Sequence, residues 1–184
     1  MLPDTQLIES ALLVVRWQRG DREAFEGLVK LWERSLFYYL RRLARTEADA
    51  WELLQETWLK AIKSLHTLRD PRALPSFLYT IARNAALSRL RSRDYENEAY
   101  PESIPDHRND DVGVALENVE QVHHALAQLP LPQREALTLY FLQDLSLDEM
   151  SELLDVPLGT VKSRLHYAKL ALRTILSPGD DHGR

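Results

Sequence analysis

The last third of the chain, residues 125–176, holds the pattern that most constrains the fold. A short helix expected over 146–154 and a turn lead into a second helix, expected over about 160–176. On that second helix apolar and basic side chains form two adjacent rows at helical spacing: Val161, Leu165, Ala168 and Leu172 in one, Lys162, His166, Lys169 and Arg173 in the other. An amphipathic helix with a basic outer row, placed second in a helix-turn-helix, is typical of a reader of the DNA major groove.

The charge distribution is compatible with that interpretation although the net charge is −5. Residues 60–93 carry eight Lys or Arg and one acid, whereas residues 94–120 carry nine acids and one Arg. Local positive charge is what meets a phosphate backbone, and net charge mainly governs non-specific attraction. A basic helix face taken alone is also compatible with ordinary solvated surface.

The first half of the chain predicts helices over about 6–19, 22–44, 46–65 and 76–93. Gly20-Asp21 marks the first break, and the prolines of segment 66–75 mark a loop. The second helix has an apolar face expected to be buried: Phe25, Leu28, Val29, Trp32, Leu36, Tyr39, Leu40 and Leu43.

The third helix, 46–65, opens with a Thr46-x-x-Asp49 pattern that resembles a capping box. Its apolar row is expected to be core: Trp51, Leu54, Trp58, Ala61 and Leu65. The opposite side is then expected to be exposed, and a Leu beside Gln and Glu there fits a docking face for another protein: Leu53, Gln55, Glu56, Leu59 and Lys60. From the residues alone, an ordinary solvated helix face is the alternative.

Segment 94–113 is acidic, contains two prolines and shows no sustained periodicity of apolar residues, which predicts a flexible linker. Helices are expected after it over about 114–128 and 132–142, and Ser146-x-x-Glu149 is a capping box for the next one. Nothing indicates a β-sheet. We therefore predict an all-α chain with two small helical domains joined by an acidic linker: residues 5–93, linker 94–113, residues 114–176, and a polar tail over 177–184.

Several classes of function are unexpected for this sequence. The chain has no cysteine, which excludes disulfides and thiolate metal sites. The adjacent His123 and His124 lie on different faces of a helix, so we expect no metal site, and we find no catalytic constellation and no cofactor motif. There is no apolar run long enough for a membrane span and no secretory signal, so we expect a cytoplasmic protein without membrane insertion.

Four motifs in order carry a resemblance to a known family. They are Gly20-Asp21-x-x-Ala24-Phe25, the run Ala50-Trp-Glu-Leu-Leu-Gln-Glu-Thr-Trp-Leu-Lys60, the run Phe77-Leu-Tyr-Thr-Ile-Ala-Arg-Asn84, and Gly159-Thr-Val-Lys-Ser-Arg-Leu165. Together they resemble the extracytoplasmic-function class of the bacterial sigma-70 family, over roughly residues 8–93 and 115–176. Phe77 stands where the family favours Trp, and Tyr167 stands where the family frequently has Arg.

The resemblance implies a dissociable specificity subunit of RNA polymerase that is not itself an enzyme. It implies two partners, promoter DNA and core polymerase, the latter bound through the clamp helices of its largest subunit. An anti-sigma factor is a further partner that members of the class often have. The first domain corresponds to sigma region 2, which binds core polymerase and recognises and melts the minus-10 element. The second corresponds to region 4, which reads the minus-35 element. The resemblance assigns core-polymerase binding to Leu53, Gln55, Glu56, Leu59 and Lys60.

Promoter melting requires walls for an extruded base, a polar group for its edge and cations for the backbone. Phe77 and Tyr79 supply rings, Asn84 supplies an amide, and Arg83 supplies charge. The resemblance places the base pocket here, with Asn84 as the base-contacting residue and with a neighbouring loop: His66, Thr67, Leu68 and Arg69. The alternative is that Phe77 and Tyr79 are core and that Asn84 bonds to the backbone.

The recognition helix offers donors in its first turns, which point toward base edges in such motifs. Lys162 or Arg164 can donate to guanine, and Ser163 can bond a base or a phosphate. The candidate minus-35 residues are Thr160, Lys162, Ser163, Arg164, His166, Tyr167 and Lys169.

Two other classes of function remain open from the residues. One is a conventional DNA-binding regulator, which uses the C-terminal motif on an operator and the N-terminal helices for dimerisation or sensing. The other is an adaptor whose helices bind only protein. A regulator of this type usually dimerises on two half-sites, whereas a sigma factor acts as one copy on an asymmetric site.

Overall fold

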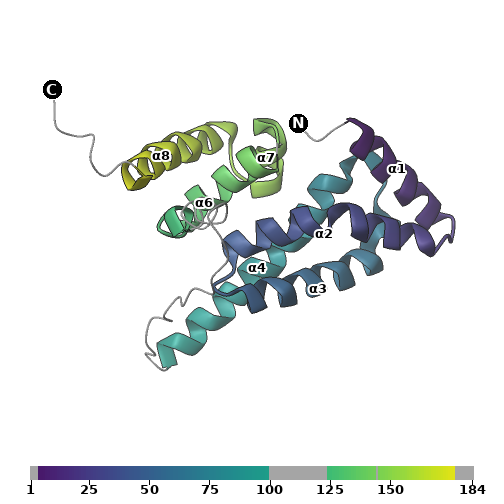
Figure 1. Cartoon of the computed structure of the whole chain (residues 1–184), viewed down its shortest axis with the longest axis horizontal. Coiled ribbons are helices and arrows are strands. Elements are labelled where there is room, and N and C mark those ends of the chain that lie inside the picture. Colours follow the sequence, from purple (N-terminus) through teal and green to yellow (C-terminus); the bar gives the residue numbers. More distant parts are fainter. Residues whose placement is uncertain (1–3, 100–123, 144, 177–184) are drawn as a thin grey trace, which may run out of the picture.

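The computed structural model describes residues 4–99, 124–143 and 145–176, and all regular elements in those ranges are helical. The first part contains α1 (Asp4–Gln18), α2 (Glu23–Leu43), α3 (Glu47–Ser64), the short 3₁₀ turns η1 (Leu65–Thr67) and η2 (Pro71–Ala73), and α4 (Leu74–Ala99). The second part contains α6 (Leu131–Leu137), the π-helical turn η3 (Thr138–Leu142), α7 (Leu147–Leu154) and α8 (Leu158–Leu176). Figure 1 shows the two parts as a bundle of α1–α4 and a smaller helical group at its side.

Local signals in the sequence account for most helix ends. Gly20, with φ of +95°, ends the first helix in a conformation that L side chains rarely adopt. The hydroxyl of Thr46 accepts a hydrogen bond from the Asp49 amide at 3.1 Å, which confirms that Thr46 caps α3. Asp155 takes the left-handed conformation, φ 53°, and this turns the chain between α7 and α8.

Helix α4 is longer than predicted at both ends. It begins at Leu74 and continues to Ala99, whereas the predicted helix covers 76–93 and the predicted linker begins at Asp94. The start of the linker at Asp94 is therefore wrong. No Gly or Pro interrupts residues 76–100, and Glu and Arg are good helix formers, so acidic composition alone does not stop the helix. Residues 100–113 of the predicted linker and most of the predicted helix 114–128 lie outside the described residues, which are helical again from His124 to Ala127.

The core of the first bundle is centred on α2. The face predicted from periodicity is confirmed for its largest members, since Trp32, Leu36, Tyr39 and Leu40 are completely buried. Leu28 and Leu43 are also buried, whereas Phe25 and Val29 at the N-terminal end are half-buried. The Trp32 indole donates a hydrogen bond to Ser10 Oγ at 2.9 Å, which fixes α1 against α2.

The buried face of α3 differs from the predicted one in two positions. Trp51 is 44% exposed, so its assignment to the core is wrong, and Leu53 is 2% exposed, so its assignment to the outward docking face is also wrong. Helix α3 contacts both α2 and α4, and the face between them carries small side chains that permit close approach. The buried residues of α3 are Asp49, Ala50, Leu53, Leu54, Thr57 and Ala61.

The second part is the predicted helix-turn-helix. Ser146 and Glu149 form a complete capping box at the start of α7, with Ser146 Oγ accepting from the Glu149 amide and the Glu149 carboxylate accepting from the Ser146 amide. On α8 the predicted apolar row faces inward: Val161, Leu165 and Ala168 are buried and Leu172 is half-buried. The all-α fold with two helical units is confirmed.

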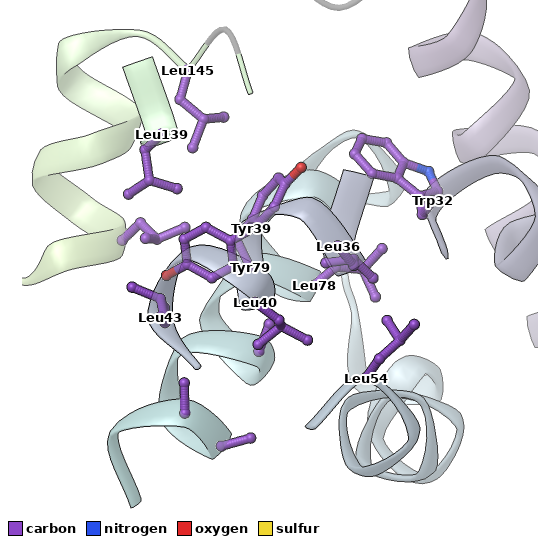
Figure 2. Packing of buried hydrophobic residues seen from close by; sticks show 14 of the residues in the cluster. Trp32, Leu36, Tyr39, Leu40, Leu43, Leu54, Leu78, Tyr79, Leu139 and Leu145 are labelled. Carbon is purple, nitrogen blue, oxygen red and sulfur yellow. The ribbon is translucent and has the colours of Figure 1, made fainter. Parts of the chain in front are cut away.

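The two units share one continuous apolar core. Leu139 of η3 and Leu145 before α7 lie beside Tyr39 of α2 and Tyr79 of α4, as Figure 2 shows. All four side chains are at most 3% exposed. The helix-turn-helix unit is therefore packed against the region of α2 and α4 that carries these two tyrosines.

Candidate nucleic-acid interface

Helix α4 presents a mixed aromatic and amide face at the position predicted for base binding. Asn84 is exposed, and Phe77, two helical turns earlier on the same face, is half-buried against the core. Exposure of the Asn84 amide leaves it able to meet a base edge. Phe77 combines both predicted roles, since one side of its ring packs on the core and part of it remains accessible.

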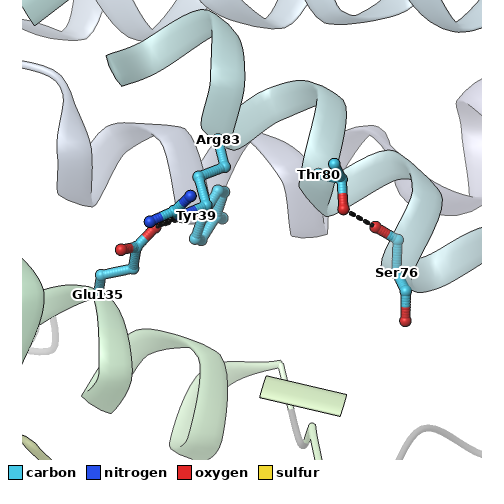
Figure 3. Close-up of polar contacts among 5 residues, drawn as sticks. All are labelled: Tyr39, Ser76, Thr80, Arg83 and Glu135. Carbon is cyan, nitrogen blue, oxygen red and sulfur yellow. Dashed lines mark hydrogen bonds and ion pairs between the residues drawn. The ribbon is translucent and has the colours of Figure 1, made fainter. Parts of the chain in front are cut away.

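Arg83, the neighbour of Asn84, is engaged across the boundary between the two helical units. Its Nε donates to Glu135 Oε1 of α6 at 2.9 Å, and the hydroxyl of Tyr39 donates to the same oxygen at 2.8 Å. Figure 3 shows Glu135 reaching from α6 toward Arg83 and Tyr39. Burial, together with the neighbouring Glu135 charge, raises the pKa of Tyr39 well above its usual range.

Tyr79 does not line an accessible pocket. Its ring is completely buried and packs edge-on against Tyr39, with centroids 5.3 Å apart. Its hydroxyl donates to the side-chain oxygen of Gln143, and burial raises its pKa. The prediction of Tyr79 as a wall of a base pocket is wrong, because the ring packs between the helices against Trp32 and Tyr39 of α2. The alternative that Tyr79 is core describes it.

The loop predicted to complete the pocket lies between α3 and α4. His66, Thr67 and Arg69 are exposed, whereas Leu68 is half-buried and packs on the core. The Gln18 amide on α1 donates to the carbonyl of Leu68 at 2.8 Å and to that of Leu65 at 3.3 Å. This loop is thus held to the bundle by its backbone, which leaves the three exposed side chains available to a ligand.

The outer face of α8 carries most of the residues predicted to read DNA. Lys162, Ser163, His166 and Tyr167 are exposed, and Thr160 and Arg164 are half-buried. Ser163 Oγ donates to the Thr160 carbonyl at 3.0 Å, and the rings of His166 and Tyr167 lie edge to face with centroids 5.4 Å apart. The first two turns therefore present a cation and hydroxyl groups together, as a groove-reading helix requires.

Lys169 has a different environment from the other candidates on α8. Its Nζ lies over the rings of Tyr140 and Phe141, 5.4 Å and 5.1 Å from their centroids. It lines an apolar cavity of about 400 Å³ between α8 and the residues of α6 and η3, together with Leu126, Leu137, Thr138, Phe141, Leu172, Arg173 and Leu176. Lys169 is therefore held toward the neighbouring helix and away from the first turns of α8.

The exposed face of α3 retains four of the five predicted docking residues. Gln55, Leu59 and Lys60 are exposed and Glu56 is half-buried, with Lys60 Nζ and Glu56 Oε1 2.6 Å apart. Leu59 is 62% exposed, which is unusual for a leucine in the middle of a helix. Sequence reasoning missed Trp51, Glu52 and Ile62 on this side. Glu52 and Ile62 stand three residues from Gln55 and Leu59, and this helical spacing could have identified them.

Within the described ranges no helix combines the length and the apolar character needed to cross a membrane. The same residues contain no group of three or more His, Asp or Glu side chains arranged to hold a metal ion.

Comparison with known families matches both helical units. The family model described as sigma-70 region 2 matches residues 28–95, and that described as sigma-70 region 4 matches residues 119–172. The RNA polymerase sigma-H factor of Pseudomonas aeruginosa is 30% identical over 179 residues, which cover 90% of this chain and 93% of the relative. The extracytoplasmic-function sigma factor SigM of Mycobacterium tuberculosis strain ATCC 35801 is 33% identical over 167 residues, with 91% and 84% covered.

Solved structures give the same result for the fold. The sigma factor RpoE of Bartonella quintana, solved in complex with the anti-sigma factor NepR, superposes with a TM-score of 0.72 at 25% identity, covering 83% of this chain and 96% of that one. CnrH, solved in complex with the cytosolic domain of CnrY, superposes with a TM-score of 0.70 at 22% identity and covers 94% of this chain and 99% of that one. The latter likeness supports the fold alone.

Proposed function

The chain belongs to the extracytoplasmic-function class of the sigma-70 family, an alternative sigma factor that directs promoter-specific transcription initiation, and from this premise we propose which of its surfaces perform each step. The observation that carries the proposal is that the exposed candidate residues fall on three separate helices, α3, α4 and α8. Helix α3 has the chemistry of a protein-docking face, whereas α4 and α8 have the chemistry of contacts to two different promoter elements.

Helix α3 is the proposed docking face for the clamp helices of the largest polymerase subunit. The exposed residues of this face are Glu52, Gln55, Leu59, Lys60 and Ile62, with half-buried Glu56 among them and Trp51 at one edge. Leucine, isoleucine and tryptophan supply apolar contact area, and the charged side chains beside them set the register against a partner helix. Leu53 has no part in this face because it is buried in the bundle.

Helix α4 and the loop before it are the proposed surface for the minus-10 element. Asn84 would bond the edge of an extruded base and Phe77 would contact its face, while Arg83 and the loop residues His66, Thr67 and Arg69 would meet the backbone. Arg83 becomes available only when the helix-turn-helix unit moves away from α4, since Glu135 of that unit engages it here.

The first turns of α8 are the proposed surface for the minus-35 element. Lys162 and Arg164 would donate to guanine, Ser163 and Thr160 would bond a base or a phosphate, and His166 and Tyr167 would lie closer to the backbone. Lys169 is left out of the base contacts because it lies over Tyr140 and Phe141.

The sigma-70 family consists of specificity subunits, which are generally not catalytic. We propose that this chain has no catalytic site of its own and that it acts in the cytoplasm, where polymerase and promoter DNA meet. We also propose an anti-sigma factor as a partner, since the RpoE structure to which the chain is similar contains one.

Run-off transcription with purified core polymerase on a library of genomic promoter fragments tests the proposal. The expected result is that a small set of fragments gives transcripts of defined length only when this protein is added. The reaction without it, and a reaction with a general sigma factor, serve as controls. Absence of core binding, or tight binding to a palindromic duplex without polymerase, would contradict the sigma assignment and favour a conventional regulator.

A further inference from the structure

A buried polar network joins the two helical units at the helix proposed to meet the minus-10 element. The Glu135 carboxylate on α6 accepts hydrogen bonds from Tyr39 and Arg83, residues 96 and 52 positions away in the chain. Glu135 and Tyr39 are 3% and 0% exposed, and the Arg83 side chain is 19% exposed. Charge-assisted hydrogen bonds in such a setting are stronger than neutral ones and hold their partners in defined positions.

A second buried contact lies beside the first. The Gln143 side chain accepts a hydrogen bond from the Tyr79 hydroxyl and donates to the Ser35 carbonyl at 3.3 Å, so one residue of the second unit connects α4 and α2. Leu139 and Leu145 pack around the two tyrosines, as described for Figure 2. Glu135 and Gln143 thus lie within one closed interface between the two units.

The position of Glu135 suggests a competition with DNA. A carboxylate and a phosphate offer the same kind of anionic oxygens to a guanidinium, and one Arg83 cannot serve both at full strength. We propose that Glu135 is an intramolecular latch that occupies Arg83 in the free protein and holds the second unit against α4, and that this latch must open before Arg83 can contact the minus-10 element. The inference rests on the proposed function in taking α4 as the minus-10 surface.

Two arginines at the same interface reduce the stability of the closed arrangement of the two helical units. Arg134 of α6 donates to the carbonyl of Arg42 on α2 at 3.2 Å and to those of Ala127 and Leu129 at 2.7 Å and 3.1 Å, but the Nε atoms of Arg134 and Arg42 are buried without a hydrogen-bond partner. Burial lowers the pKa of both side chains. Burying a cation without a full set of partners is unfavourable, so the favourable Glu135 contacts are partly offset and the closed form can be released by a binding partner.

The distance between the two units in the free protein tests the latch directly. The chain has no cysteine, so exposed Glu9 on α1 and exposed Thr174 on α8, both outside the proposed docking face, can be changed to cysteine and carry one spin label each. Pulsed electron–electron double resonance is expected to give one dominant distance between the two spin labels in this protein. With Glu135→Ala the ratio of closed to open molecules is expected to fall by about tenfold or more, the effect of losing a buried charged hydrogen-bond acceptor.

Glu152→Ala is the matched control because it removes the same charge from an exposed position on α7 in the same unit. It should leave the distance distribution unchanged. Circular dichroism verifies that each variant keeps its helices, and if Glu135→Ala loses them, Arg83→Ala removes the other side of the ion pair and should broaden the distribution in the same way. A distribution that is already broad in the labelled parent, or identical in the Glu135→Ala and Glu152→Ala proteins, would overturn the latch.

Addition of core polymerase separates failure of the latch from failure of the proposed function. With the latch and the function both correct, polymerase shifts the parent protein to longer distances and binds Glu135→Ala more tightly than the parent. Failure of polymerase to bind either protein would reject the sigma assignment. A difference in distance distribution between the free parent and the free Glu135→Ala protein would still establish the latch.

Discussion

The indole of Trp51 stacks on the ring of Phe37, with centroids 4.2 Å apart and planes inclined by 31°. Trp51 nevertheless remains 44% exposed, and Tyr38, whose ring is a neighbour of Phe37, is 42% exposed. The aromatic side chains of Trp51 and Tyr38 are thus partly exposed at the edge of the exposed face of α3, where Phe37 of α2 packs against Trp51. Tryptophan is enriched among the residues that dominate protein interfaces, so Trp51 extends the proposed docking face for polymerase.

The first prediction concerns that docking face. Leu59→Glu is expected to weaken binding to core polymerase by at least about tenfold, because it places a charge where the partner would cover an apolar side chain. Leu12→Glu on α1 is the matched control, since Leu12 is 58% exposed and Leu59 is 62% exposed. Fluorescence anisotropy with labelled protein gives both affinities. If the Leu59→Glu and Leu12→Glu proteins bind core polymerase with equal affinity, α3 is not the docking face.

The second prediction concerns the exposed amide on α4. Asn84→Ala is expected to reduce opening at the minus-10 element, because the change removes the partner of the base edge and keeps helix propensity. Loss of one base contact corresponds to about 1–3 kcal/mol and relaxes sequence preference at one position. Permanganate footprinting measures the opening, and a premelted template should restore transcription if the defect is confined to melting. Unchanged footprints and unchanged minus-10 preference would make Asn84 a structural residue only.

The third prediction concerns the first turns of α8. Lys162→Ala is expected to reduce promoter binding by the holoenzyme and to relax preference within the minus-35 element if Lys162 contacts a base. A contact to phosphate would instead lower affinity for all sequences and reduce the salt dependence by about one unit of slope. Lys30→Ala on α2 removes the same charge from an exposed position in the other helical unit. A similar loss of minus-35 binding in both variants would show a general effect of charge.

The fourth prediction follows from the raised pKa values of Tyr39 and Tyr79. Because the folded-state pKa of each hydroxyl lies above its unfolded value of about 10, the associated stability is fully present below that pH and is lost as the pH rises further. The melting temperature should therefore fall between about pH 10 and 11, and the fall should be smaller in Tyr39→Phe. Differential scanning calorimetry over this range measures it.

Tyr167→Phe serves as the control for this pH effect because Tyr167 is 60% exposed. It should retain the full alkaline decrease of the parent. An alkaline decrease of the same size in all three proteins would mean that Tyr39 does not couple ionisation to folding.

The positions of the helices could be predicted because their signals are local. The period of Val161, Leu165 and Ala168 is a property of neighbouring residues on one helix, and the Ser146–Glu149 capping box needs only three residues of separation. The exposed residues on α8 follow from the same periodicity, and so does exposure of Leu59 on α3. The ends of α4 were less predictable, since composition distinguishes a charged helix from a charged linker poorly.

The sequence by itself determined an all-helical chain, two helical units and the order of their motifs. Only the tertiary structure decided where the buried face of α3 ends, because burial of Leu53 and exposure of Trp51 depend on how closely α2 and α4 approach it. The contact of Glu135 with Arg83 and Tyr39 was equally beyond the sequence. Periodicity assigns a face within one helix, but it carries no information about which faces of distant helices meet, and that pairing is fixed by packing of the whole molecule.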